Sequence, residues 1–417
     1  MKSKFEYEHD QKQETVILVA VCLERLEETE ESLDELEELA STAGAKTVAR
    51  CIQNREFIHN GTYVGSGKIQ EIKDLLWETE ADGIICDDEL TSIQIRNLEM
   101  ELDCKILDRT LVILDIFASR ARTKEGKIQV ELAQLRYHAT RLTGKGTSMS
   151  RLGGGIGTRG PGEKKLEVDR RLIRNRIGHL SRELKQVVKH REVQRQKRSK
   201  NHLPVVCIAG YTNAGKSTLL NYYTDANVLE EDKLFATLDP TTRIVTLPNG
   251  QEILMTDTVG FIRKLPHHLV DAFRSTLEEA KYSDLILHVV DASNPQHEKQ
   301  MAAVYETFRQ LEIQDKKILT VFNKIDQVGE KEFFKDPNAD EVISISARKG
   351  IRTAELLRLI EETLTAGQIY VEKIFSYEQA WKIQKIRKYG SVLKEEYRED
   401  GIYVEAYVPS EVVNSLA

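Results

Sequence analysis

A glycine-rich loop that ends in lysine and serine carries the clearest chemical signal in the sequence. Residues 210–218 read GYTNAGKST, which fits the phosphate-binding pattern G-x-x-x-x-G-K-[ST]. The loop follows the apolar run PVVCIAG and opens a helix-like segment, TLLN, which is the context this pattern requires. We expect its backbone N–H groups to bind phosphate oxygens, with Lys216 at the β- and γ-phosphates and the Ser217 hydroxyl on Mg²⁺. A glycine-rich turn without a ligand is the weaker alternative. The expected phosphate-site residues are Gly210, Tyr211, Thr212, Asn213, Ala214, Gly215, Lys216, Ser217 and Thr218.

A second short motif, Asp-Thr-Val-Gly, ends a later strand-like run. Asp257 stands at the carboxyl end of this run, where a carboxylate can hold the water shell of a magnesium ion. Gly260 has no side chain, so its backbone N–H can approach a γ-phosphate. The D-x-x-G pattern is common alone but specific at about forty residues after a phosphate loop. The motif adds Asp257, Thr258, Val259 and Gly260 to the expected site, and Gly260 joins Lys216 as a catalytic candidate.

A third motif, N-K-x-D, indicates which base is bound. It covers residues 323–326 and directly follows the strand-like run ILTVF. The Asp326 carboxylate can accept two N–H bonds from guanine, whereas adenine presents no matching pair of donors. A buried acceptor left unpaired costs about 1–3 kcal/mol. A Ser-Ala-Arg segment follows the next strand, where a backbone N–H can meet guanine O6. The ordered series of motifs predicts GTP rather than ATP, with base contacts from Asn323, Lys324, Asp326, Ser346, Ala347 and Arg348.

In this order and spacing the motifs resemble those of the translation-factor-related GTPases. A narrower resemblance, to the HflX family, rests on GYTNAGKST, LFATLDPTTR, DTVGFI, NKID and SAR, preceded by GTYVGSGK and GGGIGTRGPGEKKLEVDRR. It runs from about Thr15 to about Ala366, and the Gly-rich block is its most family-specific part. The last fifty residues match the family only loosely. GTYVGSGK lacks the spacing of a phosphate loop, so we expect a structural turn there.

The resemblance implies a GTPase that produces GDP and phosphate with Mg²⁺ as cofactor. It also implies binding to the rRNA and proteins of the large ribosomal subunit, and the dissociation of stalled or stress-inactivated ribosomes. The FATLD segment resembles the family's magnesium-binding segment, which favours Thr237 as a magnesium ligand over the alternatives Thr241 and Thr242. The nucleotide contacts implied here are Phe235, Ala236, Thr237, Leu238 and Asp239.

The residue after D-x-x-G has consequences for hydrolysis. Many GTPases place there a glutamine that orients the attacking water, but this chain has Phe261, whose ring cannot polarise water. The phosphate loop contains Asn213 in the form GxxNxGKS, which resembles that of GTPases stimulated by potassium. Asn213 is therefore a third catalytic candidate, with K⁺ as a possible activator. A loop-bracing hydrogen bond by its side chain is an equally weighted alternative.

The segments that must position these motifs divide the chain into four parts. Residues 1–115 alternate strand-like runs with helices, which predicts a small, mostly parallel α/β domain. Residues 116–201 carry two apolar seams at 4-3 spacing around a Gly-rich loop, 143–163, which predicts an antiparallel helical hairpin. Residues 202–367 predict a doubly wound, mostly parallel GTPase domain, and residues 368–417 a small α+β segment.

The charge distribution indicates a polyanionic partner. The net charge is −7, yet residues 120–200 hold 23 Lys and Arg against 7 Asp and Glu. A single basic block in an acidic chain is typical of contact with a polyanion at one place. A positive, Gly-rich loop can follow rRNA phosphates, so Lys145, Arg151 and Arg159 are expected RNA contacts. The alternative is a solvated coiled-coil face, but both signs normally alternate on such faces.

The composition of the chain argues against a membrane-spanning, a secreted or a disulfide-bonded protein. The longest apolar run, Val16–Leu23, is far shorter than the ~20 residues of a membrane span, and no secretory signal opens the chain. Five cysteines without a CxxC pair indicate buried thiols. We expect a cytoplasmic, partly ribosome-associated protein that is monomeric. Two rival functions stay open: a GTPase that acts in ribosome assembly or on other RNA, and a signalling switch with protein partners only.

Overall fold

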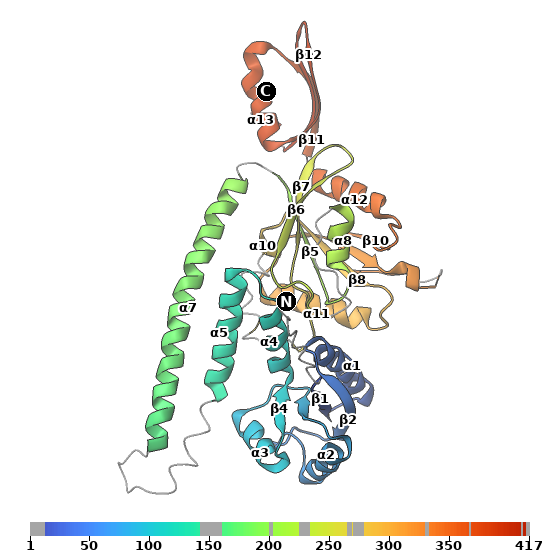
Figure 1. Ribbon diagram of the computed structural model, residues 1–417. Helices are drawn as coiled ribbons and strands as arrows, with labels where there is room; N and C mark the ends of the chain where they lie inside the picture. The colour runs from blue at the N-terminus through green and yellow to red at the C-terminus, as the bar shows by residue number, and fades with distance from the viewer. Residues whose placement is uncertain are drawn as a thin grey trace, which may run out of the picture. The chain divides into compact units, whose positions relative to one another are not determined.

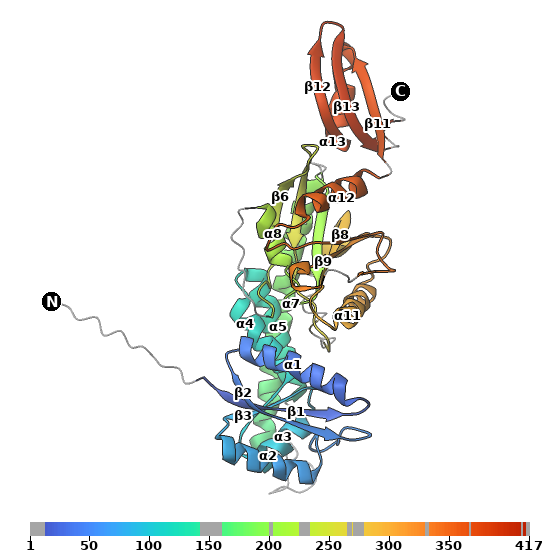
Figure 2. The same ribbon diagram turned by 90° about the vertical axis from the view of Figure 1, so that its right-hand side faces the viewer.

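The computed structural model describes residues 13–141, 161–199, 203–224, 234–264, 269, 279–329, 333–366, 368–409 and 412–413. These residues form two compact units, and Figures 1 and 2 show the elements of each. The first unit contains residues 13–119 and 130–181, and the second contains residues 120–129 and most of the chain from 182 onward. Across the described ranges, no helix is both long enough and apolar enough to span a membrane.

The first unit contains a four-stranded parallel sheet in the order β2-β1-β3-β4. Its strands are β1 (Thr15–Cys22), β2 (Lys46–Asn54), β3 (Gly83–Cys86) and β4 (Lys105–Asp108). The central strand β1 is buried along almost its whole length, as expected for an apolar run inside a parallel sheet. Its helices are α1 (Leu26–Thr42), α2 (Ser66–Thr79), α3 (Ser92–Leu102) and α4 (Arg109–Arg120). The predicted mostly parallel α/β domain is confirmed.

Strand β4 and helix α4 are elements that the sequence pattern did not predict. Helix α4 buries residues on several sides, including Val112, Ile113 and Leu114 in succession. Residues 110–117 read TLVILDIF, a nearly continuous apolar run, and such a run does not distinguish a buried helix from a strand. The N-terminal domain therefore continues beyond the last helix that the apolar pattern indicated.

The basic region forms two long helices, α5 (Lys124–Arg141) and α7 (Pro161–Ser199). Two ion pairs, each 2.7 Å long, join them: Lys124 with Glu183, and Arg176 with Glu131. An earlier residue of α5 pairs with a later residue of α7, so the helices are antiparallel, as predicted. Most of the predicted Gly-rich tip, together with Lys145, Arg151 and Arg159, lies outside the described residues.

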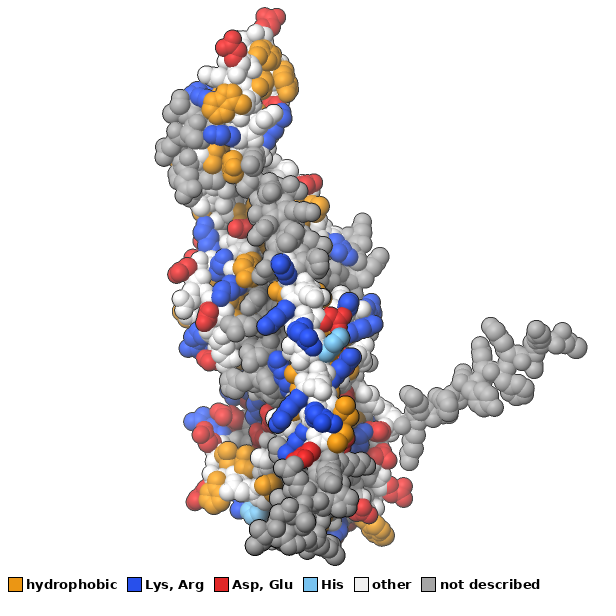
Figure 3. Space-filling view, turned by 90° about the vertical axis from the view of Figure 1, so that its left-hand side faces the viewer, with side chains coloured by type: hydrophobic (Ala, Val, Ile, Leu, Met, Phe, Trp, Pro, Cys, Tyr) orange, Lys and Arg blue, Asp and Glu red, His pale blue; other side chains and the backbone are white. Residues whose placement is uncertain are grey.

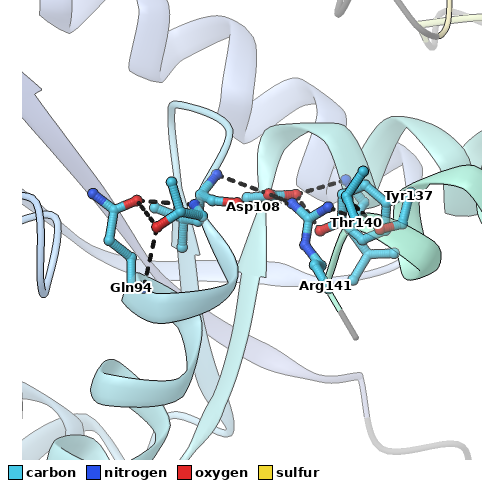
Figure 4. Close-up of polar contacts among 8 residues, drawn as sticks. Gln94, Asp108, Tyr137, Thr140 and Arg141 are labelled. Carbon is cyan, nitrogen blue, oxygen red and sulfur yellow. Dashed lines mark hydrogen bonds and ion pairs between the residues drawn. The ribbon is translucent and has the colours of Figure 1, made fainter. Parts of the chain in front are cut away.

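A buried carboxylate at the end of β4 holds the last turns of α5 (Figure 4). Asp108 accepts hydrogen bonds from the Tyr137 hydroxyl at 2.7 Å and from an Arg141 guanidinium N–H at 2.6 Å. It also accepts from the backbone N–H groups of Leu90 at 3.0 Å and Leu111 at 2.9 Å. A fully buried charge is tolerated because each oxygen is paired in this way. Asp108 therefore has a structural role: it joins the end of β4 to the last turns of α5.

The predicted GTPase domain has a six-stranded sheet in the order β10-β9-β8-β5-β7-β6. Neighbouring strands are parallel except the pair β6/β7, which is antiparallel. The strands are β5 (Val205–Gly210), β6 (Thr241–Thr246), β7 (Glu252–Asp257), β8 (Leu285–Asp291), β9 (Lys317–Asn323) and β10 (Glu341–Ser344). The helices are α8 (Lys216–Tyr223), α10 (Glu279–Tyr282), α11 (His297–Gln310), the short 3-10 helix η3 (Ile325–Gln327) and α12 (Thr353–Thr365). The strand order reverses beside β5, and the carboxyl ends at such a point are where doubly wound sheets bind ligands.

The C-terminal segment is a small α+β structure, as predicted. Its antiparallel sheet has the order β11-β13-β12, with β11 (Gln368–Phe375), β12 (Ser391–Arg398) and β13 (Gly401–Pro409). The 3-10 helix η4 (Tyr377–Gln379) leads into α13 (Ala380–Tyr389), which packs Ile383 and Ile386 on one face of the sheet. All five cysteines of the chain are free thiols, and four are buried, so the expectation of unpaired thiols is confirmed.

Candidate functional site

The phosphate loop connects β5 to α8 at the point where the strand order reverses. Gly210 and Gly215 have φ angles of 154° and 90°, a region that favours glycine. A side chain at Gly215 would also collide with the amide of Asn323, which belongs to the N-K-x-D motif. That amide donates a hydrogen bond to the Ala214 carbonyl at 2.9 Å. The loop and the base-recognition motif are therefore in direct contact.

Lys216 occupies the position expected of the phosphate-binding lysine. Its side chain is buried, and its ammonium donates to the Tyr211 carbonyl of the same loop at 2.7 Å. Burial lowers the pKa of Lys216 to about 8, although the nearby Asp257 carboxylate opposes this shift. The buried ammonium has lost most of its hydration, which disfavours its charged form. A bound anion would offset that loss, so Lys216 is well placed to bind a phosphate.

Three oxygen-bearing side chains converge beside the loop. The Ser217 hydroxyl donates to Asp257 at 2.7 Å and lies 2.9 Å from the Thr237 hydroxyl. Asp257 is fully buried, and burial raises the pKa of its carboxyl, although Lys216 and the two hydroxyls oppose this shift. The second carboxylate oxygen, Oδ1, has no hydrogen-bond partner. Mg²⁺ prefers hard oxygen ligands, so two hydroxyls and an unsatisfied carboxylate oxygen fit a magnesium ion and its water shell.

The two alternative threonines lie elsewhere in the same unit. The Thr242 hydroxyl lies 2.9 Å from the Thr256 hydroxyl on the neighbouring strand, and Thr241 begins β6 opposite Asp257 in the strand register. Of the three candidate threonines, only Thr237 has its hydroxyl within hydrogen-bond distance of the Ser217 hydroxyl. The geometry thus favours Thr237, although its role as a magnesium ligand stays a prediction.

The D-x-x-G segment is joined to the phosphate loop through backbone contacts. The Thr212 N–H donates to the Phe261 carbonyl at 2.8 Å, and the Phe261 N–H donates to the Gly210 carbonyl at 3.1 Å. A side chain at Gly260 would approach Thr212 Cγ2 to 2.7 Å and Lys216 Nζ to 3.0 Å. Only glycine therefore fits at position 260. The Phe261 ring is buried against Phe308.

The base-recognition residues meet at the carboxyl end of β9. Asp326 accepts from the Ser346 hydroxyl at 2.7 Å and lies 3.3 Å from the Lys349 ammonium. These partners, Ser346 first, lower the pKa of Asp326, so the carboxylate is ionised near neutral pH. Asn323 accepts from the Ala347 N–H at 2.9 Å. The predicted base contacts from the two separate loops are thus brought together.

Two residues of this cluster were missed by the sequence reasoning. Asp291, at the end of β8, forms a 2.7 Å ion pair with Lys324. A carboxylate that ends an apolar strand is the signal that could have indicated it. Lys349 follows the Ser-Ala-Arg segment directly, but nothing in its local sequence distinguishes it from a solvated lysine.

The remaining predicted residues have different surroundings. Tyr211, Thr212, Phe235, Leu238, Thr258 and Val259 are buried in the domain, and Arg348 is exposed. The Thr258 hydroxyl donates to the Ile208 carbonyl at 2.8 Å, which is a structural contact. The Asp239 side chain binds the backbone at the start of α5.

Comparison with known proteins agrees with this geometry. Three family profiles match in succession: "GTP-binding GTPase N-terminal" over residues 30–118, "GTP-binding GTPase Middle Region" over 120–198 and "50S ribosome-binding GTPase" over 205–324. A protein named GTPase HflX from Lacrimispora saccharolytica is 65% identical over 405 residues, covering 97% of this chain and 96% of its own length. GTPase HflX of Escherichia coli is 42% identical over 87% of this chain and 86% of its own.

Among solved structures, a GTP-binding protein from Sulfolobus solfataricus in complex with GDP is 26% identical, with a TM-score of 0.45 over 85% of this chain and 99% of that chain. The high identity to GTPase HflX proteins over nearly the whole length, together with the nucleotide motifs in place, decides the assignment. The chain is a GTP-hydrolysing enzyme that belongs to the HflX family of GTPases.

Proposed function

We propose that this GTPase binds the large ribosomal subunit in its GTP-bound state and dissociates stalled or stress-inactivated ribosomes into subunits. The profile that matches residues 205–324 is described as a 50S ribosome-binding GTPase, which supports the choice of partner. The observation on which the proposal rests most is the basic, exposed surface of helix α7.

Lys and Arg side chains gather along α7 in the space-filling view (Figure 3). The exposed basic residues in the described part of the helix include Arg171, Arg174, Arg182, Lys185 and Lys189. Exposed arginine and lysine side chains on one helix can neutralise successive phosphates of an RNA backbone. A helix that merely faces solvent would usually alternate both signs of charge. The surface of α7 therefore supports an rRNA contact.

The nucleotide would control this activity through the segment that contains Thr237. We propose that Ser217 and Thr237 hold Mg²⁺ directly and that Asp257 holds it through water. When bound, the ion would neutralise charge on the phosphate oxygens. Thr237 would then fix its segment against the phosphate loop in the GTP state. After hydrolysis that restraint is lost, which is a common way for a GTPase to change its partner surface.

Phe261 cannot orient the attacking water as a glutamine would, so hydrolysis needs another group that stabilises the transition state. We propose that Asn213 helps to hold K⁺ beside the phosphates, where a positive charge stabilises the transition state. Asn213 has a φ angle of 60°, so the loop carries it in a left-handed conformation that asparagine tolerates better than most residues. If K⁺ has no effect, the stabilising group must come from the ribosome.

Cosedimentation of the full chain with purified subunits tests the proposed partner. We expect binding to the large subunit with a non-hydrolysable GTP analogue, weaker binding with GDP, and a steep decrease as salt rises. Equal binding to free RNA would favour action in assembly or on other RNA. Binding only to proteins, with little salt dependence, would favour a signalling switch. We further propose that the protein is a cytoplasmic, partly ribosome-associated monomer, which sedimentation alone and in lysate would test.

A further inference from the structure

The segment after Thr237 makes an unexpected contact with the start of helix α5. One oxygen of the Asp239 carboxylate accepts hydrogen bonds from the backbone N–H groups of Arg122 and Thr123, each at 2.9 Å. The other oxygen accepts from the Thr123 hydroxyl. Helix α5 begins at Lys124, so Thr123 is its N-cap and Arg122 comes just before it. The two hydrogen bonds therefore fix the chain at the point where α5 begins. The carboxylate also lies at the positive end of the helix dipole.

Thr123 connects this carboxylate to the helix itself. Its hydroxyl oxygen accepts a hydrogen bond from the Gly126 N–H at 3.0 Å, which is the contact of a helix N-cap. The same hydroxyl donates its hydrogen to Asp239. Two successive hydrogen bonds therefore join Asp239 to the first turn of α5. The Thr123 hydroxyl is the donor in one of them and the acceptor in the other.

Asp239 approaches Gly126 so closely that a side chain at position 126 would displace the carboxylate. A Cβ atom added to Gly126 would lie 2.5 Å from Asp239 Oδ1 and 3.2 Å from the Thr123 hydroxyl oxygen. Glycine inside a helix otherwise costs about 1 kcal/mol relative to alanine. The absence of a side chain at position 126 is thus explained by the contact with Asp239.

Asp239 is also close in sequence to the nucleotide site, because it follows Thr237 by two residues. The Thr237 hydroxyl lies 2.9 Å from the Ser217 hydroxyl of the phosphate loop. Leu238, between them, is buried with 2% of its surface exposed. The short segment therefore has three attachments in succession: a hydroxyl in the nucleotide site, an apolar side chain in the core, and a carboxylate on α5. Only Leu238 separates the first attachment from the third.

We propose that Asp239 is a positioning residue that couples the bound nucleotide to the start of α5. In the GTP state Thr237 and Asp239 are both held, so the first turn of α5 is ordered. In the GDP state the release of Thr237 loosens Asp239, and Thr123, the N-cap of α5, loses the carboxylate that orients it. By linkage, a stable cap must in turn favour GTP over GDP. This inference rests on the proposed role of Thr237, but it does not require any ribosome function.

Hydrogen exchange of the full chain measures the coupling in one direction. With Mg²⁺ and a non-hydrolysable GTP analogue, the amides of residues 122–127 should exchange at least about fivefold more slowly than with GDP, the lower end of typical coupling factors. Asp239→Ala should abolish this difference. Asp239→Asn should retain part of it, because the amide oxygen can still accept from both N–H groups. Equal exchange in the two nucleotide states of the wild type, or a difference that survives in Asp239→Ala, would overturn the proposal.

A substitution on the helix side measures the coupling in the other direction. Gly126→Ala should improve helix propensity, yet it should weaken binding of the GTP analogue by about fivefold or more while GDP binding is unchanged. Gly67→Ala is the matched control, because Gly67 also lies in a helix and a Cβ there would meet nothing within 4 Å. Unchanged analogue affinity in Gly126→Ala would contradict the coupling. Magnesium dependence of GTP binding in Thr237→Ala separately tests the assignment of Thr237.

Discussion

The ring of Phe261 packs edge-on against the ring of Phe308, with 5.7 Å between their centroids. Phe261 is the residue after D-x-x-G, where a water-orienting glutamine stands in many GTPases. Only 2% of its surface is exposed, so its side chain belongs to the core rather than to the reaction centre. Unassisted hydrolysis should therefore be slow, and a stimulating group must come from another source.

We predict that a bound K⁺ ion stimulates GTP hydrolysis in place of the missing glutamine. GTP turnover, basal or stimulated by ribosomes, should be faster in K⁺ than in Na⁺ at equal ionic strength. Asn213→Ala should remove that difference with little loss of GTP affinity, because the backbone donors of the loop remain. Steady-state phosphate release in the two salts measures this, and equal wild-type rates would rule out a potassium site.

The choice of base is predicted to depend on Asp326. Asp326→Asn should shift preference from GTP toward xanthosine triphosphate, because the amide offers a donor where the carboxylate offers only acceptors. We expect GTP binding to weaken by about 1–3 kcal/mol, the cost of an unsatisfied buried polar group. Competition between the two nucleotides gives the preference directly. Wild-type GTP affinity in the variant would show that Asp326 does not bind guanine.

Nucleotide binding should take up a proton at mildly alkaline pH. The pKa of Lys216 is lowered to about 8 by burial, so the free ammonium is about half deprotonated at pH 8. Bound phosphates favour the charged form and raise this pKa, so binding at pH 8 should take up roughly half a proton. At pH 6 the lysine is already charged and contributes nothing.

Calorimetry in buffers of different ionisation enthalpy measures the proton uptake. Lys216→Arg is the control, because a guanidinium stays protonated throughout this pH range and should show no uptake. Uptake that is equal in the wild type and in this variant would mean that another group titrates.

The basic hairpin is predicted to supply the salt dependence of ribosome binding. Arg151→Ala with Arg159→Ala should weaken association with the large subunit and reduce the salt slope by roughly one for each lost phosphate contact. GTP affinity should be unchanged. Lys373→Ala removes an exposed charge from β11 instead and should alter neither quantity. An identical salt titration for the double variant and the wild type would exclude these arginines as rRNA contacts.

Local motifs were enough to predict the nucleotide site because its parts follow strands in a fixed order. The loop at residues 210–218, the D-x-x-G motif and the N-K-x-D motif each follow a strand that the apolar pattern identifies. Parallel strands bring these ends to one edge of the sheet, so their proximity could be expected from sequence.

Other features could not be predicted because they depend on packing. Helix α4 contains a nearly continuous apolar run in the sequence, which does not distinguish a buried helix from a strand. The contact between Asp239 and Thr123 joins residues 116 positions apart, and no local pattern in a single sequence reports such a pair. The ion pair of Asp291 with Lys324 has the same origin, since it joins the ends of two strands.

The central claim, that GTP drives this protein to separate ribosomal subunits, is tested most directly by one sedimentation experiment. Intact ribosomes are incubated with the full chain and either GTP, a non-hydrolysable analogue or GDP, and the subunits are then resolved on a sucrose gradient. We predict conversion of intact ribosomes into separate subunits with GTP and with the analogue, and little conversion with GDP. An unchanged peak of intact ribosomes in all three conditions, with the protein bound to it, would contradict the account.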